Sequence, residues 1–184
     1  MELPLLVLVL VSTCGGQDWT TPTFCRGQCP QFTVVETHQD FEERLYVPAE
    51  WITTKMGGSG VADLLAARSR LAKAATDADS WPVLITVTNG SDLSLSWFVP
   101  PGTMESKITD PSVTLQSRPE VTVYVRIYGG NPSIKSGEEN AKILYDDLKK
   151  AEKTGADADT YTWAGYDNYI SFTHHNEIWI EKSQ

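Results

Sequence analysis

Arg118-Pro-Glu-Val-Thr-Val-Tyr-Val-Arg-Ile-Tyr-Gly-Gly130 is the stretch that decides the fold of this 184-residue chain. Its β-branched and aromatic residues from Val121 to Tyr128 predict a strand, which the Gly-Gly-Asn-Pro run after it ends. A capping box at Ser136-Gly-Glu-Glu139 predicts a helix that reaches Lys153 and has one apolar face. Two further strands are expected, at Thr160–Tyr166 and Glu177–Lys182. This half of the chain is therefore predicted to be a β-α-β-β unit.

The first half has the same order of elements. Phe41–Thr54 is strand-like, a glycine-rich break follows, and Val61–Ala75 has the spacing of a helix. The strands Val83–Thr88 and Leu93–Val99 are expected to pair across Asn89-Gly90, which favours a hairpin turn. A long crossover with one short strand, Ser112–Gln116, joins the halves. The sequence thus predicts an α+β fold: a twisted antiparallel β-barrel from two β-α-β-β repeats flanked by two main helices, with a ligand cleft between the halves.

Length and charge limit the organisation and the partners. The 41% of apolar residues in 184 is enough for one well-packed domain, which we expect at residues 41–184, after an N-terminal arm at 17–40. The formal net charge of −9 argues against nucleic acid and anionic membrane surfaces as partners. Nothing in the sequence indicates the oligomeric state.

Residues 1–16 are typical of a secretory signal peptide, because an apolar run from Leu3 to Val11, broken only by Pro4, precedes small residues. A buried N-terminal strand and a lipid-anchored Cys14 are the alternatives. In a secreted protein, Cys25 and Cys29 would remain as an even pair, which predicts a disulfide. Zinc would need two more ligands than this pair supplies. Asn89-Gly-Ser91 fits the glycosylation pattern.

No nucleophile, base and orienting group fall together, so an enzyme is not expected. The first predicted helix places Arg68 in the middle of an apolar face. That guanidinium could reach the edge of the face, pair with a carboxylate, or receive the carboxylate of a flat apolar ligand. His174 and His175 are weak candidates for iron or metal, because we expect them at the exposed tip of the last hairpin. The apolar face of the first predicted helix, which surrounds Arg68, comprises Val61, Leu64, Leu65, Leu71, Ala72 and Ala75.

Several motifs together resemble the SOUL haem-binding family, from about Tyr46 to Ile180. They are Tyr46-Val-Pro-Ala-Glu-Trp51, Arg118-Pro-x-x-Thr-Val-Tyr-Val-Arg126, Gly129-Gly130, Trp163-Ala-Gly-Tyr166 and Asn176-Glu-Ile-Trp179. The resemblance implies a barrel of two repeats that binds haem or another porphyrin in an apolar groove beside the first helix. The groove wall would then contain Val61, Leu64, Leu65, Arg68 and Leu71.

This chain departs from the family pattern at two places. Leu45 stands where one branch of the family has a histidine proposed to ligate haem iron, and Asp79-Ser-Trp-Pro-Val83 replaces a Met-Thr-Ala-Pro-Val segment. The leading expectation is a secreted haem or porphyrin carrier or scavenger that binds its ligand without that axial histidine. The alternatives are a secreted interaction module whose groove is filled by tryptophan, and a small-molecule hydrolase with a buried carboxylate such as Glu177 beside room for water.

Overall fold

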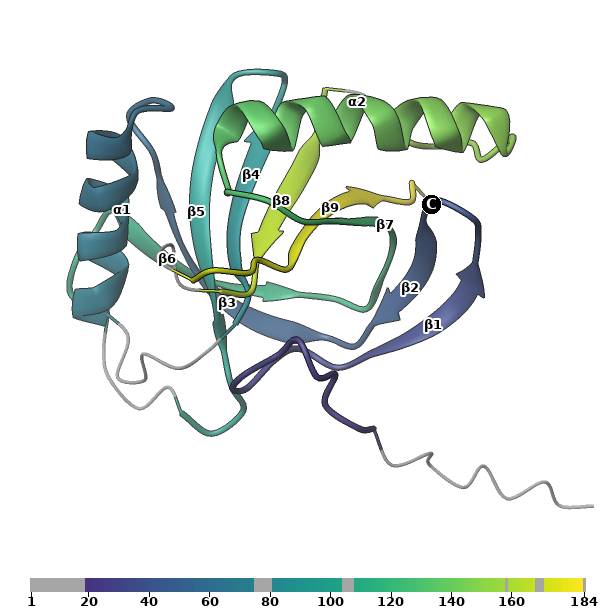
Figure 1. The fold of residues 1–184 in the computed structure, drawn as a ribbon. Helices are drawn as coiled ribbons and strands as arrows, with labels where there is room; N and C mark the ends of the chain where they lie inside the picture. The colour runs from purple at the N-terminus through teal and green to yellow at the C-terminus, as the bar shows by residue number, and fades with distance from the viewer. Residues whose placement is uncertain (1–18, 75–80, 104–107, 158, 168–170, 184) are drawn as a thin grey trace, which may run out of the picture.

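The computed structural model describes residues 19–74, 81–103, 108–157, 159–167 and 171–183. These residues form a curled nine-stranded sheet and two helices (Figure 1). The strands are β1 (Phe32–Thr37), β2 (Glu42–Tyr46), β3 (Ala49–Lys55), β4 (Val83–Thr88), β5 (Asp92–Val99), β6 (Val113–Arg118), β7 (Val121–Tyr128), β8 (Tyr161–Gly165) and β9 (Asn176–Glu181). The helices are α1 (Val61–Ala74) and α2 (Ile134–Lys150). None of the described helices is long and apolar enough to cross a membrane.

The sheet confirms the predicted repeat. Its order is β1-β2-β7-β9-β8-β4-β5-β3-β6, and every neighbouring pair is antiparallel. The units β3-α1-β4-β5 and β7-α2-β8-β9 meet where β4 pairs with β8. The predicted α+β barrel is therefore a curled half-barrel with β1 and β6 at its edges. The hairpin turn at Asn89-Gly90 is also confirmed, since both residues have positive φ, 51° and 73°.

Both helices cover the convex side of the sheet (Figure 1). Helix α2 packs through Ala141, Leu144 and Leu148 against a cluster that includes Tyr124 and Ile178. Its predicted start at Ser136 is wrong: the helix begins at Ile134, and Ser133 caps it by accepting a hydrogen bond from the backbone N–H of Ser136. The capping box therefore lies three residues earlier, because Pro132 and Ser133 end the loop there.

Helix α1 is rotated relative to the predicted apolar face. Its buried residues are Ala67, Leu71 and Ala74, whereas Arg68 is exposed. Small alanine side chains let the helix approach β3, β5 and β6 closely, and this contact decides which part of a wide apolar stripe turns inward. Arg70, two residues after Arg68, donates hydrogen bonds to Thr54 Oγ1 at 3.0 Å and to the Lys55 carbonyl at 2.5 Å.

The N-terminal arm crosses the mouth of the half-barrel (Figure 1). Cys25 and Cys29 form the expected disulfide. The Trp81 N–H donates to the Gln28 carbonyl at 2.9 Å, which fixes the arm to the segment before β4. The region assigned to the arm also contains β1, a strand that the sequence analysis did not predict. Its side chains are exposed after the first residue, so it lacks the alternation that marks a half-buried strand.

Candidate functional site

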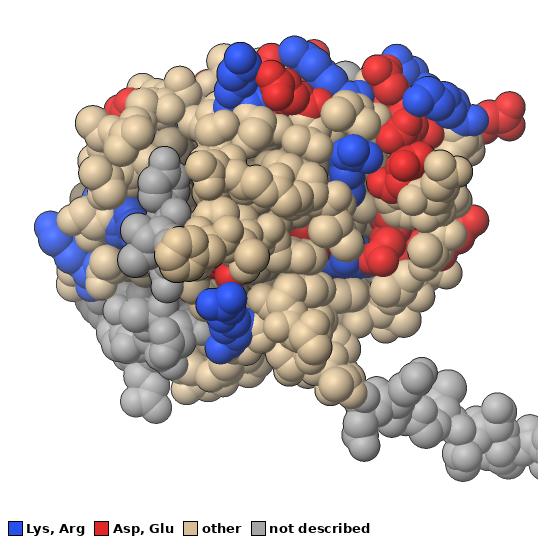
Figure 2. Space-filling model, in the orientation of Figure 1, with Lys and Arg blue, Asp and Glu red and all other residues tan. Residues whose placement is uncertain are grey.

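A groove between α1 and α2 is the first candidate site. Figure 2 shows charged side chains gathered along α2 and beyond it, whereas the surface between the helices is largely uncharged. The groove contains a cavity of about 80 Å³. Residues from α1, β4, β8 and the start of α2 line it: Leu64, Ile85, Val87, Pro132, Ser133, Ile134, Gly137, Tyr161 and Trp163. Such a lining suits the apolar face of a ligand.

Trp163 forms part of the floor of this groove because of a glycine two residues later. Both residues point to the convex side of β8, where successive side chains of one face are two positions apart. A Cβ on Gly165 would lie 2.6 Å from Cη2 and 2.8 Å from Cζ2 of the Trp163 ring. The indole thus lies over the glycine, along the sheet. The Trp163 Nε1 is buried and has no hydrogen-bond partner among the described residues.

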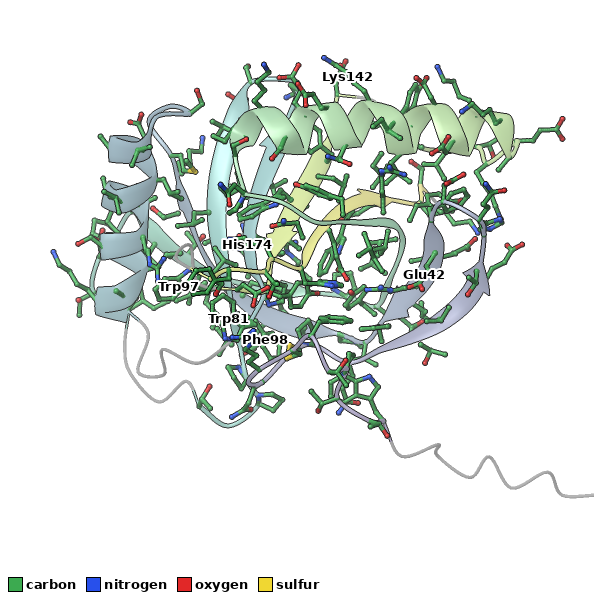
Figure 3. All side chains as sticks on the ribbon, viewed as in Figure 1. Glu42, Trp81, Trp97, Phe98, Lys142 and His174 are labelled. Atoms are coloured by element: carbon green, nitrogen blue, oxygen red, sulfur yellow. A yellow bond between two sulfur atoms is a disulfide. The ribbon has the colours of Figure 1, made fainter. Side chains whose placement is uncertain are left out.

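The rim of the groove exposes apolar side chains and one cation. Val61 and Leu65 on α1 are 73% and 60% exposed. The Arg68 guanidinium lies 6.0 Å from the ring of Trp97, which belongs to β5 on the side that α1 covers (Figure 3). This arrangement can accept a flat apolar ring whose negative group meets Arg68. On the connection between β8 and β9, Phe172 is fully exposed.

The five residues predicted for the groove wall are only partly brought together. Leu64 lines the cavity, and Arg68 follows it one helical turn later. Val61 and Leu65 face solvent on the same helix. Leu71 is fully buried against the sheet, so it supports α1 and does not face a ligand. The aromatic surface comes instead from Trp163 and Trp97, which the sequence analysis did not place at the site.

The two histidines do not form an exposed turn, and that expectation is wrong. Both are half-buried. The backbone N–H of His175 donates to the Asp167 carboxylate at 2.7 Å, which joins the two ends of the β8–β9 connection. The Phe24 ring of the N-terminal arm stacks on the His175 ring with centroids 4.0 Å apart. His174 Nε2 is buried without a hydrogen-bond partner among the residues that the structure describes.

A buried charge network lies on the concave side of the sheet. Glu177 Oε1 contacts Arg44 Nη1 at 2.9 Å and His175 Nε2 at 2.8 Å. Its Oε2 accepts hydrogen bonds from Trp179 Nε1 at 2.7 Å and from the Tyr166 hydroxyl at 3.2 Å. Glu177 is fully buried. The carboxylate is saturated by these four groups, and this leaves it no free position for an activating contact with water.

Electrostatics keep this carboxylate ionised. Burial alone would raise the pKa of Glu177, but the hydrogen bond from His175 and the charge of Arg44 outweigh it, so the pKa lies below its usual value. Burial and the charge of Glu177 raise the pKa of Tyr166 and of Tyr46, which keeps both phenols protonated. A base catalyst needs a pKa near the working pH, and Glu177 is shifted the other way.

A cluster of Glu36, His38 and Glu43 brings three metal-ligand atoms within 4.8 Å of one another. Lys153 already contacts Glu36 at 2.7 Å and Glu43 at 3.3 Å, and Lys182 contacts Glu43 at 2.7 Å. Ammonium groups therefore occupy the positions that a cation would need. This cluster is an ion-pair network that ties β1 and β2 to the ends of α2 and β9.

Solved structures of other proteins superpose on this half-barrel. The C-terminal domain of EcmrR is 11% identical and superposes with a TM-score of 0.56 over 78% of this chain and 97% of that one. SAV2435, bound to tetraphenylphosphonium, is 10% identical, with a TM-score of 0.52 over 79% and 94%. A putative transcription regulation protein from Staphylococcus aureus MU50 is 10% identical, with a TM-score of 0.50 over 80% and 100%. Such low identities show a shared fold alone.

No curated protein matches the sequence. The family described as SOUL heme-binding protein matches residues 27–181, which is most of the chain and includes both repeats. The motifs from Tyr46 to Trp179, the half-barrel of two β-α-β-β units and this match agree, and the chain therefore belongs to the SOUL haem-binding protein family.

Proposed function

We propose that this protein is a secreted carrier or scavenger of haem or another tetrapyrrole, bound at the groove between α1 and α2. The observation that carries the proposal is the Trp163 indole laid over Gly165 in an uncharged groove of a chain from a haem-binding family. A planar ring stacks on such a surface, and its propionates can pair with Arg68.

The size of the cavity limits how a tetrapyrrole can bind. Sites that enclose a drug-sized ligand measure roughly 300–1,000 Å³. The groove measures about 80 Å³, so a tetrapyrrole would rest against it with one face covered. The exposed side chains of Val61 and Leu65 on α1 then supply apolar contact area beyond the cavity. When bound, haem would supply its iron, and this chain would supply the aromatic floor and a cation.

Axial ligation of iron is not required by this arrangement. Leu45 occupies the position of the family histidine discussed above. The Nε2 of His175 is engaged with Glu177. His174 is the remaining histidine of the β8–β9 connection, and its Nε2 has no hydrogen-bond partner within the described part of the chain. We therefore expect the porphyrin ring and its propionates to dominate recognition.

The test is a titration of the disulfide-intact protein with haemin and, in parallel, with metal-free protoporphyrin. We expect saturable one-to-one binding of both, followed by the Soret band and by quenching of tryptophan fluorescence. Arg68→Glu should weaken both affinities roughly tenfold or more by reversing the carboxylate contact. Lys73→Glu makes the same charge change elsewhere on α1 and should have little effect. Binding of haemin alone, lost in His174→Ala, would show that iron ligation carries recognition instead.

The second candidate is a secreted interaction module that does not bind haem. The small cavity and the tryptophan on its floor favour it, because a filled groove offers a surface and no enclosed pocket. Binding of neither porphyrin would select this function. A hydrolase centred on Glu177 is disfavoured by the saturation of that carboxylate.

Secretion and glycosylation belong to the same proposal. Residues 1–16, the predicted signal peptide, lie outside the described residues. The Cys25–Cys29 disulfide supports an oxidising compartment, and Asn89 is exposed at the turn between β4 and β5. Expression in a secretory host should give a protein in the medium that begins near Gly15 or Gln17. Its mass should fall on treatment with an N-glycosidase, and Asn89→Gln should abolish that change.

A further inference from the structure

A second and larger hollow lies along β3, β4, β5 and β6. Its volume is about 830 Å³, and the inward side chains of these strands form much of its wall. It shares no lining residue with the groove between the helices. Its residues are Thr53, Thr54, Lys55, Met56, Gly57, Gly58, Arg70, Thr86, Thr88, Ser91, Asp92, Leu93, Ser94, Pro111, Ser112, Thr114, Gln116 and Arg118. We call this hollow the hydroxyl trough.

The lining of the trough is rich in hydroxyl groups and cationic. Eight of its residues are serine or threonine, and three are basic (Lys55, Arg70 and Arg118) against one acidic residue, Asp92. The whole chain has a net charge of −9, so this local balance runs against the rest of the protein. Cationic walls around a hollow concentrate anions there.

Arg118 is the group that most requires a partner. It is half-buried, and its guanidinium lies 5.3 Å from the Trp51 ring. It forms no hydrogen bond or ion pair with any residue that the structure describes; the charge of Glu181 acts on it only from a longer range. Burial accordingly lowers the pKa of Arg118. A partly desolvated guanidinium without a counter-ion costs stability, and its planar fork is suited to a carboxylate.

Neutral donors extend from Arg118 along the trough. The Thr53 hydroxyl lies 2.8 Å from that of Ser96 and donates to Gln116 Oε1 at 3.2 Å, which orients the Gln116 amide so that its nitrogen remains available. The hydroxyls of Thr88 and Ser94 have no hydrogen-bond partner among the described residues. Hydroxyl and amide groups of this kind form hydrogen bonds with the hydroxyls of a polyol.

We propose that the hydroxyl trough binds a carboxylated sugar, whose carboxylate pairs with Arg118 and whose ring hydroxyls bond to the threonine, serine and glutamine side chains. A carboxylate fits better than a phosphate dianion, because Arg70 is already committed to Thr54 and to the Lys55 carbonyl, so that among the described residues lining the trough Arg118 is the one guanidinium without a hydrogen-bond partner. This inference does not depend on tetrapyrrole binding.

The experiment is a titration of the full mature protein with D-glucuronate, followed by chemical shifts of backbone amides in β3 and β6. Glucose lacks the carboxylate and acetate lacks the hydroxyls, so each should bind at least roughly tenfold more weakly than glucuronate. Arg118→Gln should weaken glucuronate binding roughly tenfold or more. Lys135→Gln should leave it unchanged, because Lys135 is exposed on α2, on the other side of the sheet.

Thermal unfolding separates a ligand site from a structural arginine. Arg118→Gln should leave the Tm of the free protein unchanged or raise it, because the variant removes an unpaired charge. A glucuronate titration without saturable shifts would overturn the proposal, as would equal affinity for acetate or for glucose. Binding that survives Arg118→Gln would remove Arg118 from the site. Tighter binding of glucose 6-phosphate than of glucuronate would overturn the choice of a carboxylate.

Discussion

Gly165→Ala should displace the Trp163 ring and with it the floor of the groove between the helices. The new Cβ would lie 2.6 Å from Cη2 and 2.8 Å from Cζ2 of the indole. Reaching the 3.4 Å of an ordinary contact requires the ring to move by 0.8 Å or more. Gly165 does not have the left-handed φ that would strain an alanine. The cost of the substitution therefore comes from the clash between the new Cβ and the Trp163 ring.

The magnitude follows from the packing around the ring. Ile85 and Ile178 are the register neighbours of Trp163 and are buried, so the indole cannot shift sideways without disturbing them. Overpacking of this kind costs about 1–3 kcal/mol. For a domain of this size, that loss lowers the Tm by roughly 2–12 °C. Porphyrin affinity should fall as well, because a tilted ring no longer offers one flat surface.

Urea unfolding, thermal unfolding and the protoporphyrin titration measure these effects together. The control is Gly129→Ala, whose Cβ would meet only the His174 carbonyl oxygen at 3.9 Å and should change the free energy of unfolding little. In a Trp163→Val background, Gly165→Ala should lose most of its cost, since the clashing ring is gone. A cost that persists without the indole would refute the reasoning.

Three further predictions concern the concave side of the sheet and the arm. Arg44→Met should lower the free energy of unfolding in urea by about 3–5 kcal/mol, and adding Glu177→Leu should restore most of it; a double variant as unstable as the sum of the singles would contradict a paired network. The pKa of Glu177 is below its unfolded value of 4.5, so its contribution is fully present above pH 4.5 and is lost as the pH falls through the lower folded value. Glu177→Gln should therefore flatten the acid limb of the stability curve, and an unchanged limb would exclude Glu177 as its origin. Cys25→Ser with Cys29→Ser should cost about 2 kcal/mol and speed hydrogen exchange at the Trp81 amide, which the arm covers; unchanged exchange would show that the arm holds without the disulfide.

The repeat was predictable because its signals are local. Strand alternation, the Asn89-Gly90 turn and the glycine breaks each act over a few residues, and they recur in both halves. The strand order follows once two β-α-β-β units share a sheet. β1 escaped prediction because an edge strand with exposed valines at positions 34 and 35 has no pattern of alternating burial.

The site was less predictable because its geometry depends on contacts between distant residues. A helical wheel gave a wide apolar stripe on α1, but Ala67 and Ala74 turned a different part of it toward the sheet. The position of the Trp163 ring depends on Gly165, a relation that sequence spacing could have suggested: a large aromatic and a glycine two positions apart on one face of a strand. His175 became half-buried through Phe24, which lies far away in the sequence.

Glu177 is a case in which the sequence singles out an important residue and suggests the wrong role for it. The sequence offered it as a catalytic carboxylate, yet Arg44, 133 positions away, neutralises it, and three neutral or imidazole donors fill its remaining positions. Replacing such a pair by apolar residues is often neutral or stabilising, so its retention here is poorly explained by stability alone. The pair instead fixes β2 against β9 and aligns His175 beneath the arm. The concave centre is thus committed to holding the half-barrel together, whereas the groove between the helices and the hydroxyl trough are the surfaces that we propose to bind ligands.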